Sequence, residues 1–244
     1  MAGHSQFANI KHRKDAQDAK RAKIFIKISK EISVAVKKGG PNIESNPSLR
    51  LVLEKARANN MPKDNYEKVI KKAAGETTTD NYEEVRYEGY GPNGVAVIVD
   101  CLTDNRNRTA ANVRSYFTKK GGSLGQTNSV AYLFECKGII AFSNNQLRED
   151  EVLEWLLETE AEDLQVENNN FIITTAPDKL MQVKKFLTEV KKINDFDFDV
   201  VEITMNPTQF VEVDSSTKEK VEGLINLLEE DEDVQQVYHN AQWD

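Results

Sequence analysis

The segment GIIAFSNNQLREDEVLEWLLETEAEDLQVENNNFIITT, residues 138–175, decides the fold class. It opens with an apolar run at 138–143, typical of a strand, and continues with a helical pattern at 149–160. Two shorter runs, at 164–167 and 171–175, predict two more strands.

A helical pattern at 178–190 and a strand pattern at 200–205 follow, which completes the order β-α-β-β-α-β. That order is the ferredoxin-like arrangement. We therefore predict an α/β domain at residues 136–206.

The chain on either side of this domain predicts a second α/β unit. The strand, strand, helix and strand expected before the domain lie at 82–89, 94–102, 109–120 and 129–135. This unit is short of one helix and one strand, and the patterns at 216–228 and 234–239 supply them. Residues 207–213 read as a strand or a linker. The second unit is therefore expected to be discontinuous.

The start of the chain has helical periodicity. Phe25, Ile28, Ile32 and Val36 are three or four residues apart, which places them on one face of a helix at 16–38. Two more helices are expected at 47–59 and from Pro62 to residue 74.

The predicted fold class is α+β with three domains. The first is a basic helical domain at 1–76. The second is an α/β domain made of 80–135 plus 207–244, and the third, at 136–206, is inserted into it.

Charge is distributed unevenly along the chain. Residues 1–75 hold 17 Lys and Arg against 7 Asp and Glu, a net charge of +10, whereas the whole chain has a net charge of -8. A basic segment on an acidic body suggests a polyanionic partner for the first third. The alternative is a basic surface that folds back on the acidic domains.

The first helix would carry its cations in a stripe. Arg13, Lys20, Lys23, Lys27 and Lys30 fall nearly opposite the apolar face and would span about 25 Å at a rise of 1.5 Å per residue. Such spacing matches a nucleic-acid backbone, because each phosphate that is neutralised releases counterions.

The loop TDNRNRT at residues 103–109 lies between an expected strand and an expected helix. Arg106 and Arg108, beside the free N–H groups of a helix start, could hold a phosphate. The alternative is a local role, in which Asp104 or Thr109 caps the helix and the Asn residues shape the turn.

Catalytic and metal-binding motifs are not evident in the sequence. Residues 89–94 spell GxGxxG, but a strand rather than a helix is expected next, so we interpret them as a hairpin loop rather than a dinucleotide site. The 2 cysteines and 3 histidines are scattered and do not suggest a zinc site. The acidic run at 229–233 reads as a solvated turn. We expect no enzyme activity, no cofactor and no metal.

The composition indicates a cytoplasmic protein. No apolar run approaches the roughly 18 residues of a membrane span, the N-terminus lacks the plan of a secretory signal, and the cysteines form no CxxC pair. We therefore expect neither a membrane partner nor a small-molecule substrate.

Several blocks resemble the YebC/PmpR family. They are GHSQFANIKHRKDAQDAKRAKIFIKISKEI at 3–32, NPSLR at 46–50, NNMPKD at 59–64, YEGYGPNGVAVIVDCLTDNRNRTAANVR at 87–114 and DVQQVYHN at 233–240. The resemblance runs from end to end. It implies three domains, a cytoplasmic location and a DNA-binding transcriptional regulator, and it also implies a link to translation through relatives associated with mitochondrial translation and with stalled ribosomes.

The resemblance carries over the matching basic positions as contacts to nucleic acid: Lys11, Arg13, Lys14, Lys20, Arg21, Lys23 and Lys27. The full predicted set adds His12, Lys30, Arg106 and Arg108.

Three functions remain open at this point. The first is a DNA-binding transcriptional regulator. The second is a ribosome-associated translation factor that binds ribosomal RNA and relieves stalling; the excess of Lys over Arg favours it slightly, because Lys grips phosphate without bidentate readout of guanine. The third is an adaptor whose acidic domains bind a basic protein. No coiled coil for dimerisation is evident, so a monomer is favoured.

Overall fold

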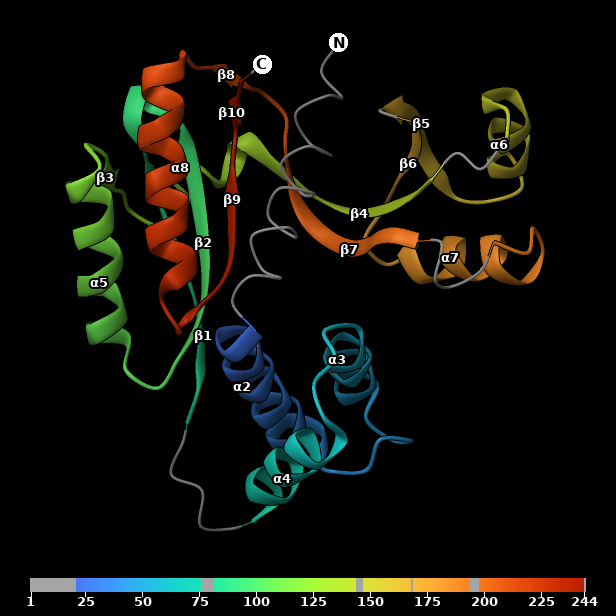
Figure 1. The fold of residues 1–244 in the computed structure, drawn as a ribbon, viewed down its shortest axis with the longest axis horizontal. Helices are drawn as coiled ribbons and strands as arrows, with labels where there is room; N and C mark the ends of the chain where they lie inside the picture. Colours follow the sequence, from blue (N-terminus) through green and yellow to red (C-terminus); the bar gives the residue numbers. More distant parts are fainter. Residues whose placement is uncertain (1–20, 76–80, 144–146, 168, 194–197, 244) are drawn as a thin grey trace. The chain divides into compact units, whose positions relative to one another are not determined.

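The computed structural model describes residues 21–75, 81–143, 147–167, 169–193 and 198–243 (Figure 1). Contacts divide these residues into two units. One comprises 132–210, and the other comprises 21–131 together with 211–243.

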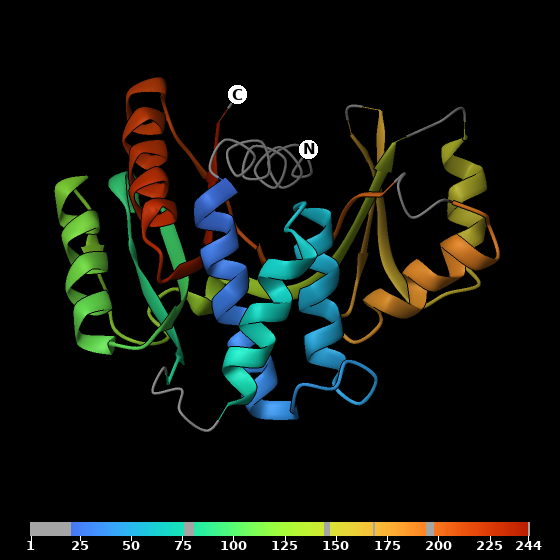
Figure 2. The same ribbon diagram turned by 60° about the horizontal axis from the view of Figure 1, so that its bottom comes forward.

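Three helices open the second of these units: α2 (Arg21–Gly39), α3 (Pro47–Ala58) and α4 (Lys63–Ala74). They lie side by side (Figure 2) around a core that includes Ile28, Ile32, Leu49 and Leu53, each at most 1% exposed. The predicted apolar face of the first helix is therefore confirmed at Ile28, Ile32 and Val36.

Buried Asn46 fixes the turn between α2 and α3. Its side-chain oxygen accepts a hydrogen bond from Leu49 N at 3.0 Å, which caps α3. Its amide nitrogen donates to Ala35 O and Gly40 O, both at 2.8 Å. One side chain thus ties the end of one helix to the start of the next.

The same unit holds a four-stranded sheet in the order β3-β1-β2-β9. Its strands are β1 (Glu83–Tyr90), β2 (Ala96–Thr103), β3 (Ser123–Leu124) and β9 (Val234–His239). Helices α5 (Arg106–Lys119) and α8 (Ser215–Glu230) pack on the face that carries Val97, Val99 and Val237. A short parallel pair, β8 (Val211–Glu212) with β10 (Ala241–Gln242), lies outside this sheet.

Strand β9, from the end of the chain, is antiparallel to β2, from before residue 132. Strand β9 therefore extends the sheet begun by β1 and β2, and helix α8 packs on one face of that sheet.

The GxGxxG segment is a hairpin connection, as predicted. β1 and β2 are antiparallel, and the 3-10 turn η1 (Pro92–Gly94) joins them. Asn93 and Gly94 have φ angles of 58° and 74°, a left-handed conformation that favours these residue types. A strand, not a helix, follows the turn.

The strand predicted at 129–135 is wrong over most of its length. Residues Ala131–Leu133 form the 3-10 turn η2, and the strand begins only at Phe134. The cause is Glu88, 3% exposed, whose carboxylate accepts hydrogen bonds of 2.8 to 2.9 Å from the backbone N–H groups of Asn128, Val130 and Ala131. Backbone donors that bind a carboxylate are not available to a strand ladder.

The other unit contains the order β-α-β-β-α-β. Its elements are β4 (Phe134–Ser143), α6 (Glu149–Leu156), β5 (Ala161–Glu167), β6 (Asn170–Thr175), α7 (Leu180–Glu189) and β7 (Phe198–Pro207). The sheet order is β5-β6-β4-β7 with antiparallel neighbours. Helices α6 and α7 cover one face, where Phe142, Phe171 and Leu187 are buried.

The α+β class is confirmed by these helices and antiparallel sheets. The predicted domain boundaries, 1–76, 80–135 plus 207–244, and 136–206, stay a prediction. Among the described residues, no helix is both long and apolar enough to cross a membrane.

Candidate nucleic-acid interface

Helix α2 presents a row of lysines beside its apolar face. Lys23, Lys27 and Lys30 are four and three residues apart, the spacing of neighbours on a helix surface. We call these three residues the lysine face. The core face is formed by Ile28, Ile32 and Val36.

The lysine face contacts the end of α8 and the residues that follow it. Lys23 Nζ donates to Glu230 O at 3.1 Å, and Lys27 Nζ donates to Glu229 O at 3.0 Å. Lys30 Nζ donates to Glu232 O at 2.9 Å and to Asp233 Oδ1 at 2.6 Å. We call Glu229–Asp233 the acidic end of α8.

These contacts have a simple physical cause. The last carbonyl groups of a helix have no intrahelical donor, and the helix dipole makes that end negative. Lysine ammonium groups near this end both satisfy carbonyl oxygens and offset the negative potential. The lysine face therefore caps α8 from a different part of the chain.

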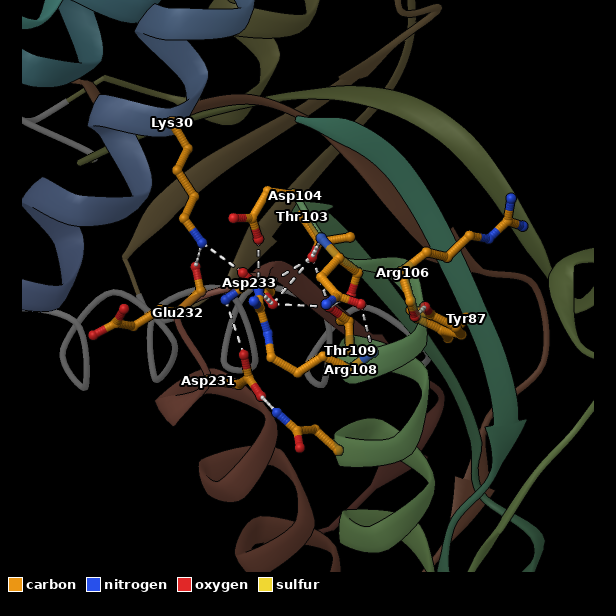
Figure 3. Close-up of polar contacts among 12 residues, drawn as sticks. Lys30, Tyr87, Thr103, Asp104, Arg106, Arg108, Thr109, Asp231, Glu232 and Asp233 are labelled. Atoms are coloured by element: carbon orange, nitrogen blue, oxygen red, sulfur yellow. Dashed lines mark hydrogen bonds and ion pairs between the residues drawn. The ribbon is translucent and has the colours of Figure 1, made fainter. Parts of the chain in front are cut away.

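Asp233 lies at the centre of a buried polar cluster (Figure 3). It is 4% exposed, and its second oxygen accepts hydrogen bonds from Arg108 Nη2 at 2.7 Å and from Thr109 Oγ1 at 2.8 Å. Burial raises the pKa of Asp233, but the hydrogen bonds from Arg108, Lys30 and Thr109 outweigh it and hold the pKa at about 2. The carboxylate is thus charged at neutral pH and paired on both sides.

Burial has the opposite effect on a neighbouring base. It lowers the pKa of Lys27 to about 8, although the nearby Glu229 carboxylate partly compensates. Holding this ammonium against α8 therefore costs part of its hydration.

The loop before α5 is organised by its own residues. Asn105 caps the helix, since its side-chain oxygen accepts from Arg108 N at 3.1 Å. The predicted caps, Asp104 and Thr109, are wrong, because Asp104 pairs with the Arg108 guanidinium at 2.8 Å and Thr109 lies buried against Asp233. The helix consequently begins at Arg106, earlier than the predicted residue 109.

The two arginines of this loop have different surroundings. Arg108 binds two carboxylates, Asp104 and Asp233, and these hydrogen bonds raise its pKa further above the usual value. The exposed Arg106 guanidinium points away from the Asp233 cluster (Figure 3), while its backbone oxygen accepts from Tyr87 Oη at 3.1 Å. Both side chains are exposed, that of Arg108 at 47%, so the two arginines differ in their carboxylate partners rather than in exposure.

Part of the predicted contact set lies outside the described residues: Lys11, His12, Arg13, Lys14 and Lys20. Arg21 begins α2, but its side chain is outside the description as well.

The lysine face is not an open surface in this structure. Lys30 is only 8% exposed, and Lys27 is half-buried. The sequence-based alternative, a basic surface that folds back on the acidic part of the chain, describes the three lysines better. The expected solvated acidic turn is likewise wrong for buried Asp233.

Sequence reasoning overlooked other exposed cations of the helical segment. Arg57 on α3 and Lys68 and Lys71 on α4 are exposed, and no hydrogen bond or ion pair joins their side chains to another residue of the described part of the chain. The excess of positive charge in residues 1–75 indicated that such cations exist. The periodicity of the first helix assigned positions only to the cations on that helix.

Within the described ranges, no group of three or more His, Cys, Asp and Glu side chains is arranged to hold a metal ion. The charged groups described above are ammonium, guanidinium and carboxylate groups, which bind by charge and hydrogen bonding.

Comparison with known proteins identifies the family. The profile of the TACO1/YebC N-terminal domain matches residues 5–76, and that of the TACO1/YebC second and third domain matches residues 82–241. The chain belongs to the TACO1/YebC family. This confirms the resemblance noted in the sequence.

Relatives in the TACO1/YebC family are similar over the whole chain. A probable transcriptional regulatory protein of Geobacillus kaustophilus is 52% identical over 98% of this chain and 97% of its own length. The probable transcriptional regulatory protein YrbC of Bacillus subtilis is 50% identical over 98% of this chain and 99% of its own length. The crystal structure of a conserved hypothetical protein from Aquifex aeolicus has a TM-score of 0.79 and 46% identity, with 93% of this chain and 92% of that chain covered.

Proposed function

We propose that the chain is a cytoplasmic, non-enzymatic regulator of transcription that binds DNA through its basic helical segment. The observation that carries the proposal is the concentration of positive charge there. Residues 21–75 hold 13 Lys and Arg against 5 Asp and Glu, on a chain whose net charge is -8. Binding to phosphates through such a segment needs neither a cofactor nor a small-molecule substrate.

Two groups of cations in this segment would carry the binding. Arg57, Lys68 and Lys71 are exposed on α3 and α4 and are open to phosphate groups. The predicted positions Lys11, His12, Arg13, Lys14, Lys20 and Arg21, together with the lysine face, form the second group. Exposed Arg106 would add a contact from the α/β part, whereas Arg108 is committed to Asp104 and Asp233.

The role in regulation is supported by the relatives. Those from Geobacillus kaustophilus and Bacillus subtilis are both named as probable transcriptional regulatory proteins, and they match nearly the full chain.

The test is DNA binding measured by fluorescence anisotropy over a series of salt concentrations. The triple variant Arg57→Glu, Lys68→Glu, Lys71→Glu should bind DNA more weakly than the unmodified protein. The slope of log K against log salt should also decrease in magnitude by about 3, because each phosphate contact contributes about 0.9 to it. A matched control, Arg114→Glu, Lys119→Glu, Lys220→Glu, changes the net charge equally at exposed positions of α5 and α8.

Equal loss in the two variants would contradict the proposal, since it would mean that only the net charge matters. Absence of DNA binding by the unmodified protein, combined with tight binding of a ribosomal RNA fragment, would replace the transcriptional role with the translational one.

A further inference from the structure

The lysine face and a nucleic acid would use the same atoms. The acidic end of α8 offers the three ammonium groups carbonyl oxygens at 2.9 to 3.1 Å and one carboxylate oxygen at 2.6 Å. A phosphate backbone offers anionic oxygens at similar hydrogen-bond distances. The acidic end is thus a chemical substitute for phosphate.

Burial makes the two uses mutually exclusive. Lys30 is 8% exposed and Asp233 is 4% exposed, so no phosphate reaches the Lys30 ammonium while that pair is intact. Lys27 donates to Glu229 O from a half-buried position and is similarly covered. Nucleic acid could contact this face only after the acidic end had moved away.

The contacts of Lys23 and Lys27 with the acidic end contribute little free energy, so their loss on binding nucleic acid has a small cost. Lys23 makes an exposed contact, and exposed charge contacts contribute little to stability. Burial of Lys27 disfavours its charged form, which offsets part of what its hydrogen bond contributes. Contacts of this kind can be replaced by a polyanion that neutralises several lysines at once.

We propose that the acidic end of α8 is an intramolecular competitor that occupies the lysine face until nucleic acid displaces it. The proposal rests on the function proposed above and adds its regulation. In the open form, the acidic end has left the lysine face. The apparent association constant for nucleic acid then equals that of the open form multiplied by the fraction of molecules that are open. Weakening the acidic end must therefore tighten binding.

The first test compares Asp233→Asn with Asp104→Asn. Both substitutions remove one negative charge and one carboxylate partner of Arg108, but only Asp233 contacts Lys30. Asp233→Asn should bind a labelled DNA duplex about fivefold or more tightly than Asp104→Asn. Adding Lys30→Gln to Asp233→Asn should abolish the gain, because the released ammonium is then absent. Equal affinity of the two single variants would overturn the proposal.

A second measurement leaves the acidic end unmodified, in case Asp233→Asn does not fold. Energy-transfer labels are attached at Leu51→Cys on α3 and Glu219→Cys on α8, both exposed positions, with Cys136→Ser to avoid a third label. Buried Cys101 stays unlabelled because burial raises the pKa of its thiol. Adding the DNA duplex should lower the transfer efficiency, and unchanged efficiency at saturating DNA would overturn the proposal.

The two hypotheses fail in different ways. If the unmodified protein binds DNA but neither measurement changes as expected, the competition is wrong and the proposed function stands. If the unmodified protein and Asp233→Asn bind neither DNA nor RNA, both are wrong.

Discussion

At the residue scale, Arg108 and Arg106 show how two arginines in one loop can differ in role. Both stood out in the sequence as candidates for phosphate binding. Arg108, although exposed, neutralises Asp233, a partner 125 residues away in the sequence, while the Arg106 side chain points away from this cluster (Figure 3). Spacing within the loop contains no information about that distant carboxylate.

We predict that Arg108→Ala destabilises the protein and that Arg106→Ala does not. Loss of Arg108 leaves Asp233 buried with one charged partner fewer, which should cost about 1–3 kcal/mol of unfolding free energy. Arg106→Ala should change it by less than about 0.5 kcal/mol, as is usual for an exposed side chain. Urea denaturation measures both. Equal effects would show that Arg108 does not stabilise the cluster.

Asp233 also predicts a dependence of stability on pH. Its pKa is about 2 in the folded chain against an ordinary value of 3.8, so the folded state favours the charged form. The resulting stabilisation, about 2 kcal/mol, is fully present above pH 4 and is lost as the pH falls from about 4 to about 2. The unfolding free energy of the unmodified protein should therefore approach that of Asp233→Asn over this interval. A difference between the two that stays constant from pH 5 to pH 2 would refute the assigned pairing.

At the element scale, the loop after β3 depends on one buried carboxylate. The N–H groups of Asn128, Val130 and Ala131 all donate to Glu88 on β1. The sequence predicted a strand here because the residues are apolar and β-prone, but a contact between residues 40 or more positions apart redirects their backbone donors. Most other helices and strands were predicted to within a few residues, since their periodicity is local.

We predict that Glu88→Gln destabilises this loop. The amide keeps the size of the side chain but turns one acceptor into a donor, which then faces a backbone N–H group. The expected cost is about 1–3 kcal/mol, with faster hydrogen exchange at residues 128–131. Glu84→Gln, at an exposed position of the same strand, is the control and should leave exchange unchanged. Unaltered exchange in Glu88→Gln would mean that other contacts hold the loop.

At the scale of the whole molecule, charge separation is the feature that sequence and structure share. The basic first third was evident from composition, and the family resemblance was confirmed over nearly the whole chain. The position of the lysine face was not predictable in the same way, because its partners Glu229–Asp233 lie about 200 residues further along the chain. Periodicity identifies which side of a helix is polar, but it does not say what that side contacts.

The central claim, that the basic helical segment binds nucleic acid, is tested most directly by ultraviolet crosslinking in growing cells with mass-spectrometric mapping of the crosslinked peptides. The account predicts nucleotide adducts on peptides from the first 75 residues, including those that carry Arg57, Lys68 and Lys71, and promoter DNA among the crosslinked nucleic acids. Ribosomal RNA crosslinked to the same peptides would support the same binding surface but would assign it to translation rather than to transcription. Adducts confined to residues 132–210, with none on the helical segment, would contradict the account.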